Sequence, residues 1–390
     1  MSVIDFPKKK LNKKKFTIFI IICVILFLIL ISSIIYCFSP SFRKFIDIYF
    51  FRKEIDSDKL PQIEISSNED TFFHAYDKYI SILNKKKLYT YNSYGEIIAE
   101  NDINISSPIF SNKNKFLAIA ENNGSKLYLI SGTNIIWQNT LEGKISKISV
   151  NKNGYVSAII SGTSYKSIVI SYDSKGNELF RTYISNSLAI SADISNDNKY
   201  LSIAEINYSG SIIKSMVKNI SIEKAKTDPT NSVIYTYNFN ENELLTNIKY
   251  QDKNYLICLT NSNIYLLNIA DCIDNNIMAI ETKYEFIDIN LKNNLLYTYN
   301  NYSNLTNTSY ISILNPQNNS KNIYEFKGSI KSIYTNDQKI AINTGSEIHF
   351  IGLNGWLIKK YDSYNEINNI LLGDSVAGII YKDKIKIIEI

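Results

Sequence analysis

An eleven-residue stretch occurs twice in this chain of 390 residues, as SNKNKFLAIAE at 111–121 and as SNDNKYLSIAE at 195–205. Related stretches, each a polar turn followed by alternating apolar residues, recur along most of the chain. The positions equivalent to Ser111 are spaced 37 to 55 residues apart, at His74, Ser111, Val150, Ser195, Tyr250, Asn290, Tyr334 and Leu371. Such a period predicts a repeat architecture, because each unit must bury its apolar face against its neighbours.

Each repeat predicts four short strands. In residues 144–186 the segments KISKISV, YVSAIIS, KSIVISY and NELFRTYI alternate between apolar and polar residues, and turns such as NKNG and DSKG separate them. Short strands without an intervening helical stretch do not form a parallel α/β sheet, so we expect an all-β domain. A repeated four-stranded unit of this length is typical of a propeller blade.

The blade count predicts a β-propeller of about eight blades in residues 61–390. Seven full blades fit between residues 71 and 366, and residues 367–390 supply three more strands. QIEIS at 62–66 precedes the first blade, and we expect it to complete the last blade by pairing with the C-terminal strand KIKIIEI. Seven blades remain an alternative, because the segment 205–243 is irregular.

One apolar segment lies near the N-terminus. Residues 16–38 read FTIFIIICVILFLILISSIIYCF, and no charged residue occurs from Phe16 to Phe42. A helix of this length is roughly 35 Å long, against about 30 Å for the hydrocarbon core of a bilayer. The run is too long for a typical signal peptide, and bulky Tyr36 precedes Cys37 where a lipoprotein signal needs a small residue. We therefore predict a transmembrane helix at 16–38.

Basic residues are concentrated before this helix. Residues 1–60 contain 11 of the 42 Lys+Arg and 5 of the 37 Asp+Glu, which leaves a body with 31 basic and 32 acidic residues. Six lysines lie between residues 8 and 15, so we expect a basic cytoplasmic tail at 1–15 and an extracytoplasmic body. The near-neutral body argues against a nucleic-acid partner.

Residues 39–60 follow the predicted transmembrane helix and contain a second helical pattern. Apolar residues recur at the spacing of one helix face, at Phe42, Phe45, Ile46, Tyr49 and Phe50. One interpretation is an amphipathic helix that lies on the membrane surface. The other is a stalk that packs its aromatic face on the propeller, and the sequence leaves both open.

Two phrases resemble blade motifs of known propellers. SNDNKYLSIAE resembles the SPDGKYLA phrase of WD40-like and TolB-like propellers, and GTNIIWQNTL looks like the Gly-x-x-Leu-Trp strand of quinoprotein-like propellers. The whole layout is similar to an uncharacterised clostridial (Firmicutes) family of single-pass membrane-anchored β-propellers. That resemblance implies no active site. Gly-His and Trp-Asp dipeptides are absent from the sequence, and Trp137 and Trp356 are too few for a tryptophan docking ring.

The sequence contains no catalytic or cofactor signature. His74 and His349 are the only histidines, and without a Gly-x-Ser-x-Gly elbow we expect them to be structural or surface residues. The cysteines show no zinc-ligand spacing, while a Cys258–Cys272 disulfide stays open. DSKGNE at 173–178 is expected to be a blade turn rather than a calcium loop. We therefore predict no catalytic, cofactor-binding or metal-binding residues.

Three hypotheses for function remain. The favoured one is a binding or scaffold module in the cell envelope; the alternative is an envelope glycan-processing enzyme, a lyase or a hydrolase. A sensor is disfavoured, because 15 residues before the helix leave no room for a cytoplasmic domain. A cluster of Asp, Glu, Tyr and Arg at one channel mouth would favour the enzyme. A bland channel with an aromatic outer face would favour the scaffold, since tyrosines bind glycans or peptides by stacking, although β-propensity also explains their abundance.

Overall fold

The computed structural model describes residues 13–39, 42–43, 46–47, 50–51, 53–55, 59–65, 71–84, 86–162, 164–279, 285–302 and 307–390. The chain divides into two compact units, Met1–Glu54 and Ile55–Ile390, and the short strand β1 (Glu54–Ile55) spans the boundary. Within the predicted helix at 39–60, residues 42–43 and 46–47 are helical, whereas 40–41, 44–45, 48–49, 52 and 56–58 lie outside the described residues. The role of that segment stays a prediction.

The first unit contains the helix α1 (Lys13–Phe38). Its segment Thr17–Phe38 has a mean hydropathy of 3.5 and is not buried within the structure, so it is long and apolar enough to cross a membrane. A signal sequence near an N-terminus has the same properties. Polar groups of the helix are satisfied locally, because the Ser33 hydroxyl donates to the Ile29 carbonyl at 2.9 Å and Arg43 Nε donates to the Tyr36 carbonyl at 3.0 Å.

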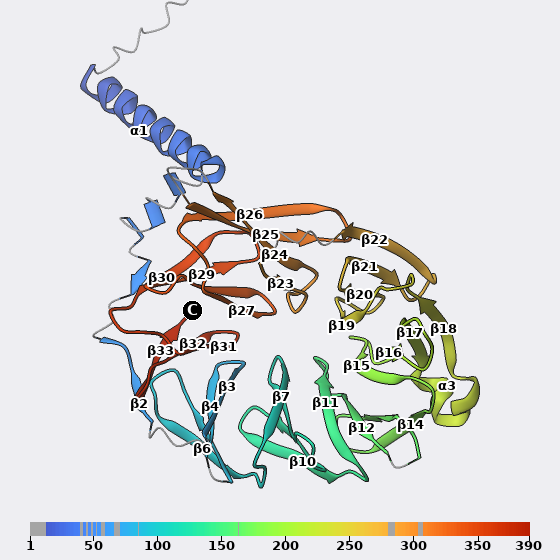
Figure 1. Ribbon diagram of the computed structural model, residues 1–390. Helices are drawn as coiled ribbons and strands as arrows, with labels where there is room; N and C mark the ends of the chain where they lie inside the picture. The colour runs from blue at the N-terminus through green and yellow to red at the C-terminus, as the bar shows by residue number, and fades with distance from the viewer. Residues whose placement is uncertain are drawn as a thin grey trace, which may run out of the picture. The chain divides into compact units, whose positions relative to one another are not determined.

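The second unit is an eight-bladed β-propeller, and each blade contains four antiparallel strands, of which the first lies nearest the centre (Figure 1). The sheet of blade 7 has the short strand β1 as a fifth strand beside β30. Blade 1 contains β3 (Thr71–Tyr76), β4 (Tyr79–Asn84), β5 (Lys87–Tyr91) and β6 (Ile97–Asp102), and blade 2 contains β7 (Pro108–Lys113), β8 (Phe116–Glu121), β9 (Lys126–Ser131) and β10 (Asn134–Thr140). Blade 3 contains β11 (Lys144–Val150), β12 (Val156–Ser161), β13 (Ser167–Tyr172) and β14 (Glu178–Ile184), and blade 4 contains β15 (Leu188–Ile194), β16 (Tyr200–Asn207), β17 (Lys214–Ser221) and β18 (Val233–Asn238).

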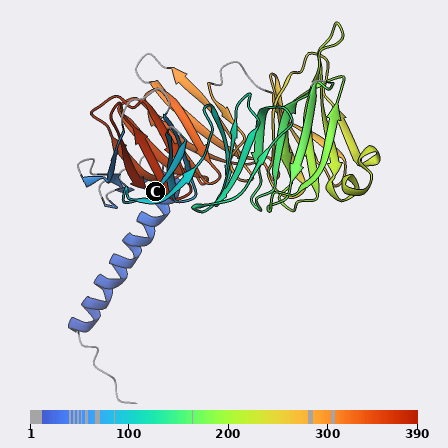
Figure 2. The same cartoon turned by 90° about the horizontal axis from the view of Figure 1, so that it is seen from below.

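The second half of the ring repeats this plan, and Figure 2 shows the strands running between the two faces of the ring. Blade 5 contains β19 (Leu245–Tyr250), β20 (Tyr255–Thr260), β21 (Asn263–Asn268) and β22 (Ile273–Ala279), and blade 6 contains β23 (Ile287–Asp288), β24 (Leu295–Tyr302), β25 (Asn307–Asn315) and β26 (Ser320–Lys327). Blade 7 contains β27 (Ser332–Asn336), β28 (Lys339–Asn343), β29 (Glu347–Gly352) and β30 (Leu357–Asp362), and blade 8 contains β31 (Asn369–Leu372), β32 (Val376–Ile380), β33 (Lys384–Glu389) and β2 (Gln62–Glu64).

Blade 8 closes the ring with strands from both ends of the domain, which confirms the predicted closure and the count of eight. β2 pairs antiparallel with β33, with Ile63 opposite Ile385 and Glu64 opposite Lys384. In Figure 1 the blue strand β2 lies beside the red strand β33. Ile63 is buried, so the closing strand contributes apolar contacts as well as hydrogen bonds.

The repeated eleven-residue stretch forms the turn between the first and second strands of a blade, as predicted. In blade 2 it covers the end of β7 and all of β8, and in blade 4 it runs from the end of β15 into β16. Asn114 and Asn198 occupy equivalent positions in the two turns, and both adopt a positive φ of 51° and 62°. Asn tolerates this left-handed conformation better than most residues, which explains why the turn repeats it.

The irregular segment 205–243 contains a helix that the sequence analysis did not anticipate. Between β17 and β18 lie α3 (Ile222–Thr227) and a 3-10 turn, η2 (Pro229–Asn231). The Ser221 hydroxyl accepts from the N–H of Lys224 and caps the helix, and Ile222 and Ala225, three positions apart, are buried. The helix has only six residues, and its two buried apolar residues do not establish a helical period. Its sequence therefore cannot be distinguished from that of a loop by periodicity.

The core lies between successive blades. Ala118 and Leu129 of blade 2 pack in one cluster with Ala158 and Ile170 of blade 3. All residues of β13 are buried. Both faces of the middle strands are therefore covered by neighbouring blades, and this is why these strands read as nearly continuous apolar runs.

Candidate functional site in the central channel

The first strands of the blades lie around the centre of the ring (Figure 1), and the space that they enclose, called the channel here, contains hollows lined by side chains of these strands and of the turns that follow them. On one side of it lies a hollow of about 460 Å³, whose lining includes His74, Asn112, Lys113, Lys249 and Asp288. The positions equivalent to Ser111 in the sequence repeat contribute five of the lining residues, which are His74, Ser111, Asn290, Tyr334 and Leu371. The repeat alignment therefore identifies one layer of the channel wall, because equivalent residues of a blade occupy equivalent positions in the ring.

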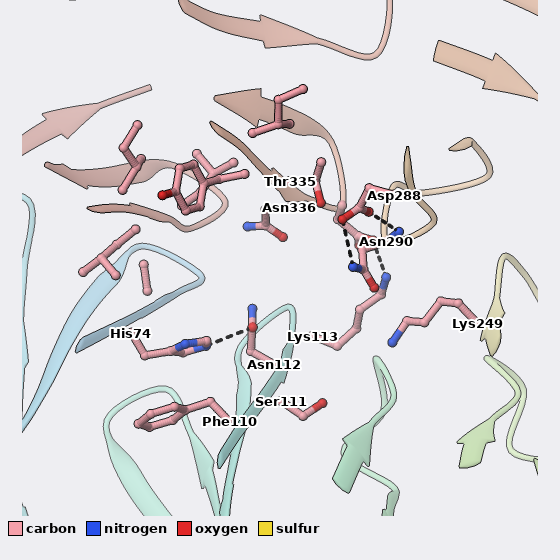
Figure 3. Close-up of a pocket in the computed structure, with 17 residues that line it drawn as sticks. His74, Phe110, Ser111, Asn112, Lys113, Lys249, Asp288, Asn290, Thr335 and Asn336 are labelled. Atoms are coloured by element: carbon pink, nitrogen blue, oxygen red, sulfur yellow. Dashed lines mark hydrogen bonds and ion pairs between the residues drawn. The ribbon is translucent and has the colours of Figure 1, made fainter. Parts of the chain in front are cut away.

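Three lysines lie on the first strands of blades 2, 3 and 5, and two of them, Lys113 and Lys249, line the hollow. Lys113 ends β7 and forms an ion pair with Asp337, which follows β27 in blade 7. Lys147 in β11 donates to the side-chain oxygen of Asn247 at 3.4 Å. Lys249 in β19 has its Nζ 3.8 Å from Asp193 Oδ1. Figure 3 shows Lys113 and Lys249 extending toward the same space.

The ammonium group of Lys249 interacts electrostatically with those of Lys113 and Lys147. Burial lowers the pKa of Lys113 and the pKa of Lys147, and in both cases the next cause is the positive charge of Lys249. Asp193 and Asp337 oppose this effect on Lys113. The lysine cluster, defined as Lys113, Lys147 and Lys249, therefore has more positive charge than the two carboxylates beside it neutralise.

Asp193 holds three blades together at this cluster. Its Oδ1 accepts from the Ser149 hydroxyl of blade 3 at 2.6 Å, and its Oδ2 accepts from the backbone N–H of Tyr250 in blade 5 at 2.8 Å. The residue is 4% exposed. Both donors are neutral and cancel no charge, so Lys249, at 3.8 Å, is a charged neighbour of this carboxylate without a close hydrogen bond to it.

His74 faces the channel but is poorly suited to act as a base at neutral pH. Its ring stacks on Phe110, with centroids 4.7 Å apart, and its Nε2 lies 3.0 Å from Asn112 Oδ1. Burial lowers the pKa of His74 to about 4, and the contact with Asn112 opposes this only partly. The imidazole is therefore neutral at pH 7, with Nε2–H donating to the amide oxygen.

His349 lies in a separate network between blades 6 and 7. It is 1% exposed, with Nδ1 2.9 Å from the Tyr324 hydroxyl and Nε2 2.8 Å from Glu347 Oε2. Lys360 lies 2.8 Å from Glu347 Oε1. Hydrogen bonding to His349 and the charge of Lys360 lower the pKa of Glu347 to about 2. The structure does not bring the two histidines into one site.

The other sequence candidates are also placed. Cys258 is buried and Cys272 is exposed, and both thiols are free, so the two cysteines are not bridged. DSKGNE forms the turn between β13 and β14, with Asp173 accepting from the N–H of Lys175 at 2.8 Å. Among the described residues, no group of three or more His, Cys, Asp and Glu side chains is arranged to hold a metal ion.

The mouth of the channel is polar and charged. A second hollow of about 550 Å³ lies at the turns between first and second strands, and its lining includes Lys113, Lys152, Lys292, Asp252 and Asp337. Neither Arg, Glu nor Tyr occurs among the described residues that line it. This composition differs from the cluster of Asp, Glu, Tyr and Arg that would favour an enzyme, and also from the bland channel expected of a scaffold.

Exposed aromatic residues gather at one place on blades 3 and 4. The rings of Tyr165 and Tyr183 lie 4.8 Å apart, and the Lys166 ammonium lies 4.3 Å from the centroid of the Tyr208 ring. Tyr183 and Tyr208 are 53% and 54% exposed, and Ile212 beside them is 40% exposed. Many other tyrosines, such as Tyr76, are buried in the core, so the tyrosine content largely reflects strand packing.

Comparisons with known proteins place the fold. The model of a family of unknown function, DUF5711, matches residues 54–390. A search of curated proteins found no match. The C-terminal WD40 domain of Sif2 is similar in structure, with 11% identity, a TM-score of 0.55, and coverage of 85% of this chain and 99% of that one. BamB from Moraxella catarrhalis has 10% identity and a TM-score of 0.49, with 85% and 100% covered.

Proposed function

Because the chain belongs to the DUF5711 family of unknown function, its role has to be argued from its own residues, and we propose a membrane-anchored, extracytoplasmic propeller that acts as a binding or scaffold module in the cell envelope. In this proposal residues 1–15 form a basic cytoplasmic tail and 16–38 the transmembrane helix. Residues 39–60 form a juxtamembrane or stalk segment whose helix ends before the strand β1, and 61–390 form the propeller outside the membrane.

The membrane anchor is supported by α1. The apolar side chains of Thr17–Phe38 are not buried against other described residues, as expected of a helix whose side chains face lipid. The six lysines between residues 8 and 15 support a cytoplasmic N-terminus, since positive charge is retained on that side of the membrane. The propeller would then follow on the outer side.

One observation carries the binding role, namely that the three lysines of the cluster have two carboxylates beside them, Asp193 and Asp337. Asp193 accepts two strong hydrogen bonds and Asp337 pairs with Lys113, while the imidazole of His74 is neutral and bonded to Asn112. These contacts connect different blades, so we assign Asp193, Asp337 and His74 a structural role rather than a role in general acid–base catalysis. A preformed hollow lined by charged side chains, with the lysine cluster at one side, is suited to holding a ligand.

The experiment that tests the binding role is cross-linking in intact cells that carry the full chain, followed by identification of the captured molecules. A chain of residues 1–60 alone is the matched control, because it retains the membrane segment and lacks the propeller. We expect partners that depend on residues 61–390. Identical capture by both chains would contradict the proposal.

A test for turnover accompanies it. The purified full chain in detergent is incubated with cell-wall glycans, and we expect saturable binding without products above those of a heat-denatured control. Turnover above that control would overturn the scaffold role. His74 and His349 would then be the first residues to replace, because they are the only histidines.

A further inference from the structure

The lysine cluster combines two lysines that line the hollow, Lys113 and Lys249, with Lys147, which contacts Asn247 on the same strand as Lys249. Lys113, Lys147 and Lys249 belong to the first strands of blades 2, 3 and 5, so the spacing of the blades fixes their positions. Half-buried lysines lose hydration, which is costly unless counter-charges replace it. Lys113 receives such a counter-charge from Asp337.

The other two lysines are only weakly compensated. Lys147 Nζ contacts a neutral amide oxygen at 3.4 Å, and Lys249 Nζ is 3.8 Å from a carboxylate that already accepts two shorter hydrogen bonds. An ammonium carries three donors, and a separation of 3.8 Å is too long for a strong hydrogen bond. The lowered pKa values of Lys113 and Lys147 agree with this surplus of positive charge.

Two further carboxylates lie farther along the wall. Asp288 accepts from the N–H of Asn290 at 2.6 Å and from its side-chain amide at 3.2 Å. Asp374 accepts from the Asn336 amide at 2.9 Å. These donors are neutral and cancel no charge, but Asp288 and Asp374 belong to blades 6 and 8, across the ring from Lys147 in blade 3.

We infer that the channel binds a phosphate group, free or as an ester on a larger ligand, between the ammonium groups of Lys113, Lys147 and Lys249. This inference rests on the binding role proposed above and names the chemistry of the ligand. Lysine ammonium groups are compact point charges, and three of them converging from separate strands fit a tetrahedral dianion. A planar carboxylate would instead be matched by the paired donors of arginine, which the described lining lacks.

The test is calorimetric titration of the full chain in nonionic detergent at constant ionic strength. The probes are inorganic phosphate, glycerol 3-phosphate and citrate. We expect saturable binding of a phosphate probe, weakened about tenfold in Lys249→Met and in Lys147→Met, the loss expected for one charge-assisted contact. Lys382→Met is the matched control, because Lys382 is an exposed lysine in the turn after β32, and it should bind as the unaltered chain does.

The two phosphate probes distinguish the source of the group. Equal affinity for both assigns the site to the free anion, whereas tighter binding of glycerol 3-phosphate assigns it to a phosphate ester. Binding of citrate alone, equal binding by Lys249→Met and Lys382→Met, or the absence of saturable binding would each overturn the inference. If cross-linking in cells still captures propeller-dependent partners, any of these results would contradict only the phosphate inference. The proposed binding role would then be unaffected.

Thermal unfolding of the unaltered chain keeps the test valid if a variant fails to fold. A ligand that binds only the folded state raises the unfolding temperature by mass action. We expect phosphate to raise it more than chloride at the same ionic strength, and an equal effect of the two salts would contradict the inference. Lys249→Met itself should unfold close to the temperature of the unaltered chain, since the repulsion that it removes from Lys113 and Lys147 offsets the ion pair that it loses with Asp193.

Discussion

The ammonium group of Lys113 forms an ion pair with the carboxylate of Asp337, although the two residues belong to blades 2 and 7. Blades 8 and 1 lie between them in the ring, so the pair bridges part of the channel mouth. Both side chains are largely buried, at 16% and 14% exposed. A pair in this setting is screened much less by salt than a surface pair.

The ion pair between Lys113 and Asp337 should contribute a measurable coupling energy to the stability of the propeller. Asp337→Asn should lower the free energy of unfolding of the propeller, because it leaves the Lys113 ammonium without its counter-charge. The double variant Lys113→Met with Asp337→Asn should lose less than the sum of the single variants, with a coupling of about 1 to 3 kcal/mol. Denaturant unfolding of all four proteins measures it. Additive losses would show that the pair makes no net contribution.

Ring closure predicts a dependence on the first strand. Removing residues 61–67 takes away β2 and leaves the edge of β33 without its partner. We expect a chain that starts at residue 68 to aggregate or to unfold more easily than one that starts at residue 56. Light scattering and thermal unfolding compare the two. Equal stability and a monomeric state for both would refute the role of β2.

A smaller change tests the same closure. Ile63 is 6% exposed and packs with residues of blades 1 and 8. Ile63→Ala should destabilise the propeller by about 2 to 4 kcal/mol, the range for deleting buried methyl groups. Glu64→Ala provides the matched control on the same strand, because Glu64 is exposed. A similar loss in both variants would mean that backbone pairing alone, rather than apolar burial, secures the strand.

His74 predicts how stability depends on pH. Its pKa is lowered from 6.5 to about 4 in the folded propeller, so the unfolded chain takes up a proton at a higher pH than the folded chain does. The contribution is fully present above pH 6.5 and is lost as the pH falls to about 4, by at most about 3 kcal/mol. His74→Gln should flatten the unfolding profile in this window. An unchanged slope would show that other groups cause it.

Cys272 offers a native probe of topology. It is exposed, whereas Cys258 is buried, and Cys23 and Cys37 belong to the apolar helix. A membrane-impermeant maleimide applied to intact, wall-stripped cells should therefore label the chain through Cys272. Labelling should disappear in Cys272→Ser. Labelling that requires cell lysis would show that the propeller is inside the cytoplasm and that the predicted orientation is wrong.

Local sequence pattern was sufficient to predict the blades. Alternating apolar residues and Asn- or Gly-containing turns predict strands from nearby residues alone, and this is why the paired segments at 111–121 and 195–205 located the same turn in two blades. The short helix α3 was missed because Ile222 and Ala225 are its only buried residues. One apolar pair does not establish a helical period.

The lysine cluster could not be predicted in the same way. Lys113 lies two positions after Ser111 in the repeat, Lys147 three positions before Val150, and Lys249 one position before Tyr250. The three residues therefore belong to no single column of the aligned repeat. Only the closed ring, with the tilt of each first strand, brings their ammonium groups together.

The closing strand also has a consequence for the order in which the protein is made. β2 leaves the ribosome soon after the apolar helix, but β33, its partner, is the last strand to be synthesised. The ring is therefore completed only after the whole domain has emerged, and contacts so distant along the chain form slowly. Until then β2 has no strand to pair with. Because β2 is only three residues long, it exposes few backbone groups that could pair with an incorrect strand.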